Sequence, residues 1–265
     1  MREFAKNLKR VVIKVGSSSI THENGDINLR KIFDLCWQLS DAKNHGYEVV
    51  LVSSGAIAAG SKRLNLKDRP NTTALKQAAS AVGQVALMNT YNRILGEFSY
   101  HGAQILLTKH IETDELMLTN AKNAFKELFN LNVIPIINEN DTISTFEIKF
   151  GDNDTLSAIV SRIIDADLLV LLSDIDGLYT CDPRENSDAE LIKNVDTITE
   201  EIKSCAQGTN SKVGTGGMVT KISAANLCME KGIDVVLANG KDMKIIKDIL
   251  EGKEIGTYFR SKKND

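Results

Sequence analysis

The sequence predicts an α/β fold, an open three-layer α/β/α sandwich whose central sheet is mainly parallel. Short, continuous apolar runs such as Val11–Val15 and Leu168–Leu172 alternate along the chain with longer segments of helical periodicity. Runs that are apolar on both faces are typical of parallel strands covered by helices on two sides. No repeat, linker or low-complexity segment divides the 265 residues, so we expect a single domain over 1–265.

Six runs are expected to form the strands, because each is short, mainly apolar and bounded by turn residues. They are Val11–Val15, Val49–Val52, Gln104–Leu107, Val133–Ile137, Leu168–Leu172 and Asp234–Ala238. The expected helices are longer and lie between or after these runs. They cover Asn28–His45, Thr72–Tyr100, Asp114–Asn130, Asp154–Asp165, Gly217–Lys231 and Asp242–Leu250. This alternation of strand and helix predicts a doubly wound sheet with right-handed crossovers.

One segment does not fit the alternation of buried strands and helices. Ile143–Phe150 largely alternates apolar and polar residues, which predicts a hairpin arm or an edge strand outside the parallel sheet. It lies between two polar clusters, Asn138–Asp141 and Gly151–Asp154, and could therefore act as a lid over a site. A plain β-hairpin without such a role explains the pattern equally well.

Composition excludes several classes of protein. The formal net charge of −3 gives no basic footprint for nucleic acid. No apolar run approaches the roughly 20 residues of a membrane span, and the charged first ten residues lack the core of a signal peptide. The four cysteines lie far apart, which favours reduced and mostly buried thiols. We therefore expect a cytoplasmic protein that binds neither nucleic acid nor membrane.

Small, polar or glycine-rich residues follow nearly every expected strand. In open α/β sheets, ligands bind at the carboxyl ends of the strands. The segments are Lys14–Ser19, Ser53–Ala56, Asn138–Asp141 and Ser173–Tyr179, with Gly151–Asp154 after the alternating segment. Loops are polar in most proteins, but several such exits at one edge of a sheet favour a shared site.

A glycine-rich run, Gly214–Lys221, leads directly into an expected helix and carries a lysine at the junction. Glycines let backbone N–H groups approach a ligand closely, and the start of a helix favours a phosphate group. The spacing matches neither the P-loop nor the Rossmann glycine pattern. The run therefore indicates a phosphate-binding loop of a third kind.

Lys14 lies inside an apolar run and is followed by Gly16 and three serines. A lysine in such a place is seldom buried without a partner. It either extends from the strand end into solvent or reaches a phosphate as a point charge, and the glycine and serines favour the second interpretation. For Ser53–Gly55, a capped turn and an anion-binding loop are equally good interpretations.

Several carboxylates have a structural alternative to a functional role. Asp154 could cap its helix, although the neighbouring Asn153 makes the segment more polar than a cap requires. Asp141 could be only a turn residue. Asp174 and Asp176 resemble metal ligands, but Asp-x-Asp-Gly is also ordinary turn chemistry, so the metal ligands stay unassigned.

Together these features indicate phosphoryl transfer. Lys14 and Lys221 lie on phosphate-type loops, and a carboxylate such as Asp154 could orient both. That chemistry depends on positioning and charge stabilisation more than on covalent catalysis. No Ser-His-Asp or Cys-His pairing is evident, which disfavours nucleophilic catalysis by the protein.

At this point the residues resemble the amino acid kinase family, and within it the glutamate 5-kinases. The resemblance covers nearly the whole chain, so the expected domain is an amino acid kinase domain over 1–265. It rests on Val12–Ser17, Val52–Ala56, Ile137–Asp141, Gly151–Asp154, Asp176–Tyr179 and Gly214–Lys221. Asn-Glu-Asn-Asp followed by Gly-Asp-Asn-Asp is the part most specific to the glutamate 5-kinases.

The resemblance implies ATP-dependent phosphorylation of the L-glutamate γ-carboxylate, the first step of proline synthesis. It implies catalytic roles for Lys14 and Lys221 on the transferring phosphoryl group, with Asp154 holding both lysines. It further implies that Ser54, Asp141 and Asn153 bind glutamate and that Mg²⁺ bridges the ATP phosphates. The implied ATP-binding residues are Lys14, Ser173, Asp174, Thr215, Gly216, Gly217, Met218, Val219, Thr220 and Lys221.

The same resemblance implies interactions that the residues alone do not indicate. These are feedback inhibition by proline, coupling to the downstream glutamyl phosphate reductase, and a homo-oligomer. Many glutamate 5-kinases carry a C-terminal PUA domain, of the kind found in RNA-modifying enzymes. We expect this chain to be a form without that domain.

Two other functions compete with glutamate phosphorylation. A kinase of the same family could act on N-acetylglutamate, aspartate, carbamate or a nucleoside monophosphate, although Asn138–Asp141 argues against it. A metabolite sensor could keep the pocket without turnover, but the presence of both lysines and of Asp154 disfavours that alternative.

Overall fold

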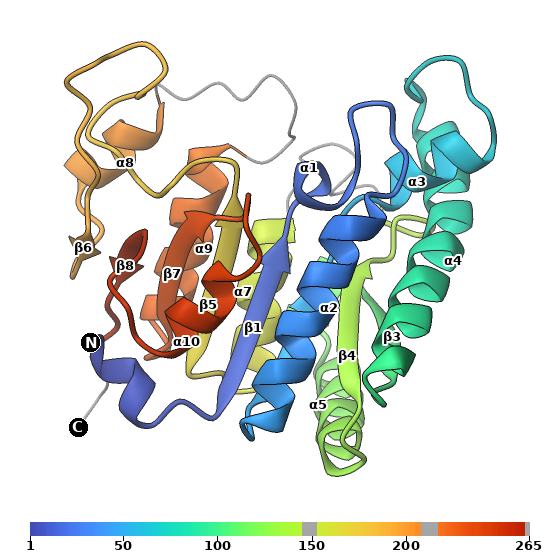
Figure 1. Cartoon of the computed structure of the whole chain (residues 1–265), viewed down its shortest axis with the longest axis horizontal. Coiled ribbons are helices and arrows are strands. Elements are labelled where there is room, and N and C mark those ends of the chain that lie inside the picture. Colours follow the sequence, from blue (N-terminus) through green and yellow to red (C-terminus); the bar gives the residue numbers. More distant parts are fainter. Residues whose placement is uncertain (145–152, 208–216, 263–265) are drawn as a thin grey trace.

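The central element is a mostly parallel sheet of eight strands in the computed structural model, which describes residues 1–144, 153–207 and 217–262. The strand order is β3-β4-β2-β1-β5-β7-β8-β6. The strands are β1 (Arg10–Val15), β2 (Glu48–Val52), β3 (Gly102–Leu107), β4 (Ile134–Glu139), β5 (Leu168–Ser173), β6 (Asn194–Val195), β7 (Asp234–Asn239) and β8 (Thr257–Phe259). Only the β7–β8 pair is antiparallel among these, so the predicted mainly parallel sheet is confirmed (Figure 1).

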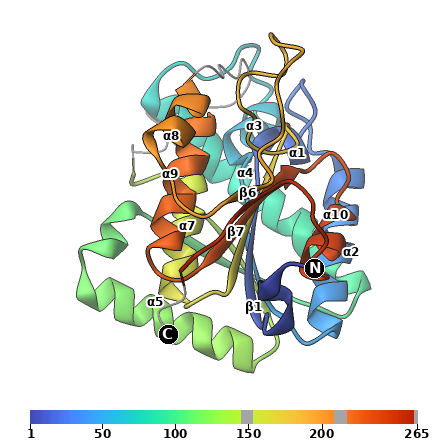
Figure 2. The ribbon, with the colours of Figure 1, turned by 90° about the vertical axis from the view of Figure 1, so that its left-hand side faces the viewer.

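Helices cover the sheet on both faces (Figures 1 and 2). The α-helices described are α1 (Ser17–Ile20), α2 (Leu29–Asn44), α3 (Ala56–Arg63), α4 (Thr73–Glu97), α5 (Glu115–Asn130), α7 (Asn153–Ile163), α8 (Glu200–Gln207), α9 (Met218–Met229) and α10 (Ile245–Leu250). Two short 3-10 helices, η1 (Glu3–Lys6) and η2 (Lys109–Glu112), complete the set. One hydrophobic core joins the sheet to α2, α3, α4 and α10, and a second joins it to α5, α7 and α9.

Strand β1 explains how one segment serves both cores. Successive side chains of a strand point to opposite faces, so Val11, Ile13 and Val15 enter the α2 side and Val12 enters the α7 side. Lys14 therefore points to the same side as Val12, toward α7 and α9. Because β1 pairs in parallel with both β2 and β5, its polar end is placed in the middle of the sheet.

Each of the six predicted strands and six predicted helices is present, with ends that differ by a few residues. Two differences matter for the site. Asn138 and Glu139 belong to β4 itself instead of following it, and the short helix α3 continues directly from the Ser53–Gly55 exit. The predicted hairpin or lid at Ile143–Phe150 lies almost wholly outside the described residues.

Helices α3 and α4 cross with their backbones in contact at two glycines. A methyl group on Gly60 would come within 1.7 Å of the Ala79 carbonyl oxygen, and one on Gly83 within 1.7 Å of the Ala56 carbonyl oxygen. Neither position accepts a Cβ without moving a helix. The crossing fixes α4 relative to the β2 exit, from which α3 begins.

The N-terminal segment packs against the last strand at the amino end of the parallel sheet. The rings of Phe4 and Tyr258 lie 5.5 Å apart, and Arg260 forms an ion pair of 2.5 Å with Glu3. Figure 1 shows the N-terminus and β8 on this side of the molecule. Within the described ranges, no helix has both the length and the apolar character that a membrane crossing requires.

Candidate active site

Two buried lysines converge on one buried carboxylate. Lys14 Nζ, from the end of β1, lies 2.7 Å from Asp154 Oδ1, and Lys221 Nζ, from α9, lies 3.1 Å from Asp154 Oδ2. Asp154 is 1% exposed, and both lysines are 7% exposed. The orienting role predicted for Asp154 thus has the geometry that it requires, with residues that are far apart in sequence.

The ionisation of Asp154 depends on its neighbours. Burial alone would raise the pKa of this carboxyl, but the charges of Lys14 and Lys221, together with hydrogen bonds from Lys14 and Thr220, lower the pKa well below its ordinary value. The Thr220 hydroxyl donates to Asp154 Oδ2 over 2.8 Å. Asp154 also lies in the first turn of α7, where the helix dipole favours negative charge. The carboxylate is therefore a fixed anion at neutral pH.

A second cluster forms around Asn153, the residue before Asp154. Its side-chain amide donates to three oxygens: the Ser53 carbonyl at 3.0 Å, Ser54 Oγ at 2.8 Å and Asn138 Oδ1 at 3.0 Å. Its own Oδ1 is buried and has no hydrogen-bond partner among the described residues. A buried acceptor of this kind is unusual and fits a ligand that brings a donor.

Asp141 borders this cluster from the β4 exit and is 5% exposed. Ser80 of α4 donates to its Oδ2 over 2.5 Å. Burial raises the pKa of Asp141, and the hydrogen bond from Ser80 partly opposes that rise. The preceding Glu139 is 3% exposed, and burial raises its pKa as well. No lysine or arginine pairs with Asp141 in the described part of the chain, so this side of the site lacks the compensation seen at Asp154.

The residues predicted for ATP are only partly described. Ser173 is the last residue of β5 and Asp174 follows it, and the Ser173 hydroxyl donates to Asp174 Oδ1 over 3.1 Å. Gly217 precedes the first residue of α9, Met218, while Val219 is 51% exposed. The predicted residues Thr215 and Gly216 lie outside the described residues.

The structure brings the catalytic and glutamate-binding predictions together at one edge of the sheet. Lys14, Asp154 and Lys221 meet directly, and Asn153 contacts Ser54. Asp141 joins through the same β4 exit that supplies Asn138.

Sequence reasoning missed Ser80 and Tyr91 as parts of the site, whereas Asn138 lies in the predicted polar segment Asn138–Asp141. Tyr91 is fully buried on α4 and shares a hydrogen bond of 2.9 Å with Ser53 Oγ. Ser80 and Tyr91 gave no local signal, because α4 also carries other polar residues, among them Lys76, Asn89 and Arg93.

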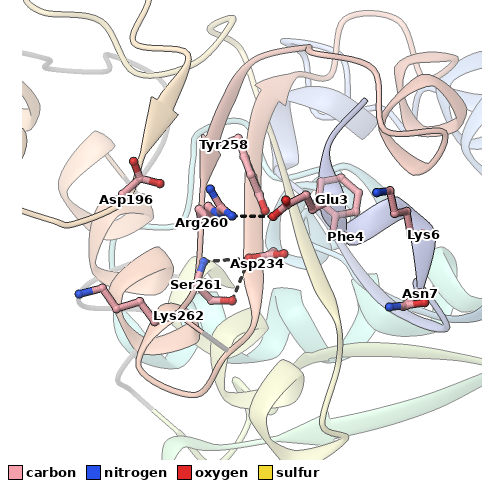
Figure 3. Close-up of a pocket in the computed structure, with 10 residues that line it drawn as sticks. All are labelled: Glu3, Phe4, Lys6, Asn7, Asp196, Asp234, Tyr258, Arg260, Ser261 and Lys262. Atoms are coloured by element: carbon pink, nitrogen blue, oxygen red, sulfur yellow. Dashed lines mark hydrogen bonds and ion pairs between the residues drawn. The ribbon is translucent and has the colours of Figure 1, made fainter. Parts of the chain in front are cut away.

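A cavity within the described part of the chain lies at the opposite edge of the sheet. It has a volume of about 630 Å³ and is bordered by η1, β8 and the start of β7 (Figure 3). Its most buried acid, Asp234, accepts two hydrogen bonds from Ser261, and its Arg260 pairs with Glu3. The cavity therefore lies away from Lys14 and Lys221, and its Asp234 and Arg260 already have partners.

The remaining predictions concern cysteines and metals. All four cysteines are free thiols; Cys36 and Cys228 are buried, whereas Cys181 and Cys205 are partly exposed, so burial was predicted correctly for only two. Burial raises the pKa of the Cys36 thiol to about 12. Across the described ranges, no group of three or more His, Cys, Asp or Glu residues is placed to hold a metal ion.

Comparison with known proteins identifies the family. The model of the amino acid kinase family matches residues 9–239. The chain is 52% identical to the glutamate 5-kinase of Clostridium tetani, covering 98% of this chain and 97% of that protein. It is also 52% identical to the glutamate 5-kinase of Clostridium perfringens over the full length of both, and 50% identical to that of Carboxydothermus hydrogenoformans, of which it covers 71%.

Solved structures agree on the fold. Carbamate kinase from Giardia lamblia, bound to AMP-PNP, superposes with a TM-score of 0.67 at 17% identity, covering 97% of this chain and 99% of that one. UMP kinase from Ureaplasma parvum gives a TM-score of 0.60 at 18% identity, with 96% and 100% covered. The chain therefore belongs to the amino acid kinase family, and within it groups with the proteins named glutamate 5-kinase.

Proposed function

We propose that this protein transfers the γ-phosphoryl group of ATP to the γ-carboxylate of L-glutamate, the first step of proline biosynthesis. The observation that carries the proposal is the centre formed by Lys14, Asp154 and Lys221 at the carboxyl edge of the sheet. Asn153, the residue before Asp154, belongs to a second cluster that suits a polar acceptor of the phosphoryl group. The glutamate 5-kinases at about half identity support glutamate as that acceptor.

The chemistry suits this arrangement. A glutamate side chain has a pKa of about 4.3, so its carboxylate is already the nucleophile at neutral pH. One of its oxygens attacks the γ-phosphorus, the bond from phosphorus to the bridging oxygen breaks, and ADP leaves. No general base is needed. The barrier comes from repulsion between carboxylate and phosphates, which the ammonium groups of Lys14 and Lys221 offset as charge develops.

Asp154 acts by holding both ammonium groups in place. A lysine side chain has several rotatable bonds, and its ammonium group is a compact charge that the stem alone does not orient. With one carboxylate oxygen facing each lysine, Asp154 orients the two charges toward the phosphate. Preorganised charges need not reorganise during the reaction, which is the main source of electrostatic catalysis.

Ser54, Asp141 and Asn153 are the proposed glutamate ligands. Asp141 would pair with the α-ammonium group, which compensates a carboxylate that burial disfavours. The unpartnered Asn153 Oδ1 would accept a hydrogen bond from the same group. Ser54 Oγ is half-buried beside them and has a hydroxyl hydrogen to offer a carboxylate.

For ATP, we propose Lys14, Ser173, Asp174 and the segment from Thr215 to Lys221. Mg²⁺ retains several waters and is commonly held by one or two carboxylates plus substrate phosphates. Asp154 is fully engaged by lysines, whereas Asp174 is exposed near the site and is the better candidate ligand. When bound, the ion would neutralise phosphate charge.

The experiment that tests the function is ADP release with Mg-ATP and L-glutamate, with hydroxylamine present to trap the acyl phosphate as a hydroxamate. Parallel reactions contain N-acetylglutamate, aspartate, carbamate or UMP. We expect turnover and hydroxamate with glutamate alone. Turnover with another acceptor would move the function to a different kinase of this family, and binding without any turnover would favour a sensor.

A homo-oligomer and a cytoplasmic location are also part of the proposal. The outer face of α4 exposes Leu75, Val82 and Val85, which lie on neighbouring turns beside the edge strand β3. Exposed apolar faces of this kind are typical of subunit contacts. Inhibition by proline and coupling to glutamyl phosphate reductase are proposed on the family resemblance alone. Coupling would suit an acyl phosphate that water hydrolyses readily.

A further inference from the structure

Helix α4 supports the proposed glutamate site through three buried polar side chains. Ser80 donates to the Asp141 carboxylate, Gln84 lies 3.5 Å from the Glu139 carbonyl oxygen, and Tyr91 shares a hydrogen bond with Ser53 Oγ. All three residues are less than one-tenth exposed. One helix thus contacts two strand exits, and none of these three residues contacts the lysines.

The contact between Ser80 and Asp141 is the strongest of the three. Its 2.5 Å separation is at the short end for a hydroxyl donating to a carboxylate, and such charge-assisted bonds are stronger than neutral ones. Ser80 is 1% exposed and Asp141 is 5% exposed, so water does not replace the bond readily. Without it, Asp141 would be a buried carboxyl with one donor fewer.

We propose that Ser80 is a positioning residue that holds the Asp141 carboxylate in the orientation and charge state required to bind the ammonium group of glutamate. This inference rests on the proposed function, because it assumes that Asp141 contacts glutamate. In this proposal, α4 contributes to the affinity for glutamate and does not take part in phosphoryl transfer.

The charge state is the second half of the inference. The hydrogen bond from Ser80 opposes the effect of burial, so losing it raises the pKa of Asp141 further. Among the described residues, the titratable group that interacts with Asp141 is Glu139 of β4, which also interacts with Ser144 and with Lys109 and His110 of η2. Ser80→Ala leaves these groups unchanged, and the Asp141→Asn background separates the titration of Asp141 from that of Glu139.

The test compares Ser80→Ala with Asp141→Asn and with the double variant, using steady-state kinetics with glutamate from pH 5.5 to 8.5. We expect Ser80→Ala to raise KM for glutamate about 10-fold with kcat and KM for ATP little changed. The acid limb of kcat/KM should move to higher pH. In the Asp141→Asn background, Ser80→Ala should have almost no further effect.

Thr90→Ala is the matched control. Thr90 is a buried hydroxyl on the same helix that donates only to the Ala86 carbonyl oxygen, so its loss should leave KM and the pH profile unchanged. Should Ser80→Ala fold poorly, Ser80→Cys keeps the size of the side chain with a much weaker donor and serves in its place.

The outcomes separate this inference from the proposed function. If Asp141→Asn raises KM but Ser80→Ala behaves like Thr90→Ala, the positioning role is wrong and glutamate binding by Asp141 stands. If both variants leave KM unchanged while the native protein phosphorylates glutamate, the role of Asp141 is wrong and the inference falls with it. Absence of any glutamate turnover by the native protein would overturn the proposed function itself.

Discussion

The two halves of the site begin at adjacent residues of α7 yet differ in how their charges are satisfied. At Asp154, two ammonium groups surround one carboxylate, and its pKa is lowered. At Asn153 and Asp141, neutral groups make the hydrogen bonds, one amide oxygen lacks a partner among the described residues, and the pKa of the carboxyl is raised.

This difference in charge compensation shows which half of the site is complete before substrate binds. The lysine centre is held by its own ion pairs and needs no ligand to become ordered. The acceptor half has an uncompensated carboxyl and an orphan acceptor, so an ammonium ligand would complete it. Changes at the first half should therefore affect kcat, and changes at the second should affect KM.

The largest effect is expected for Asp154→Asn. The substitution keeps the shape of the side chain but leaves two buried lysines without their anion, so both charges lose their orientation. We expect kcat to fall about 10³-fold, the upper range for loss of an electrostatic contact. Asp165→Asn, at an exposed position just after the same helix, is the control; equal loss in both variants would argue against the lysine-holding role.

Next in size is Lys221→Ala. Removing one ammonium leaves Lys14 paired with Asp154, so we expect kcat to fall about 10²-fold while KM for glutamate changes little. Stopped-flow or steady-state measurement of ADP release gives both constants. A rise in KM with unchanged kcat would place Lys221 in the acceptor half and remove the distinction drawn above.

Gly83→Ala should disturb the acceptor half through the fold. A Cβ at Gly83 would lie 1.7 Å from the Ala56 carbonyl oxygen, so α3 and α4 must separate and Ser80 must shift with them. We expect the free energy of unfolding to fall by about 2 kcal/mol, measured by urea denaturation, and KM for glutamate to rise. Gly96→Ala, on the same helix with open space around it, should instead leave stability equal or slightly higher.

The smallest effect concerns pH. The lowered pKa of Asp154 contributes stability that is present above its unfolded value of about 3.9 and is lost as pH falls below it. The raised pKa of Asp141 acts in the opposite direction: its contribution is fully present below about pH 3.9 and is lost as pH rises through the folded pKa. Asp141→Asn should therefore lessen the decline in stability as pH rises above about 4. Denaturation curves at several pH values measure this, and an unchanged decline would contradict the assignment.

The apolar pattern of the sequence made most strands of the sheet predictable. Val11–Val15 and Leu168–Leu172 are apolar on both faces, and such runs form central strands almost regardless of context. By contrast, β8 has only three residues, Thr257–Phe259, and its pairing with β7 depends on a distant partner. Helix α3 was not predicted, because the sequence Ser53–Gly55 before it is typical of a simple turn. Gly55, the N-cap residue of α3, has a left-handed φ of 91°. That the chain forms one domain stays a prediction.

Lys14 and Lys221 could be predicted as members of the candidate site because a lysine in an apolar strand and one in a glycine-rich run are unusual in themselves. Ser80 was not, since a serine within a 25-residue helix gives no local signal. Only the fold brings it against Asp141, 61 residues away. Asn138 differs from Ser80, because the polar segment Asn138–Asp141 did indicate the site. Only its place inside β4, where it accepts a hydrogen bond from Asn153, was not expected.

The contact between the N-terminal segment and the residue that follows β8 has a practical consequence. Glu3 pairs with Arg260, and Arg2 donates its backbone N–H to the Gly252 carbonyl oxygen, so the first residues are tied to one corner at the amino edge of the sheet. Lys14, Lys221 and Asp154 lie at the other edge. An affinity tag or an immobilising linker attached before Met1 would therefore lie away from the proposed nucleotide site.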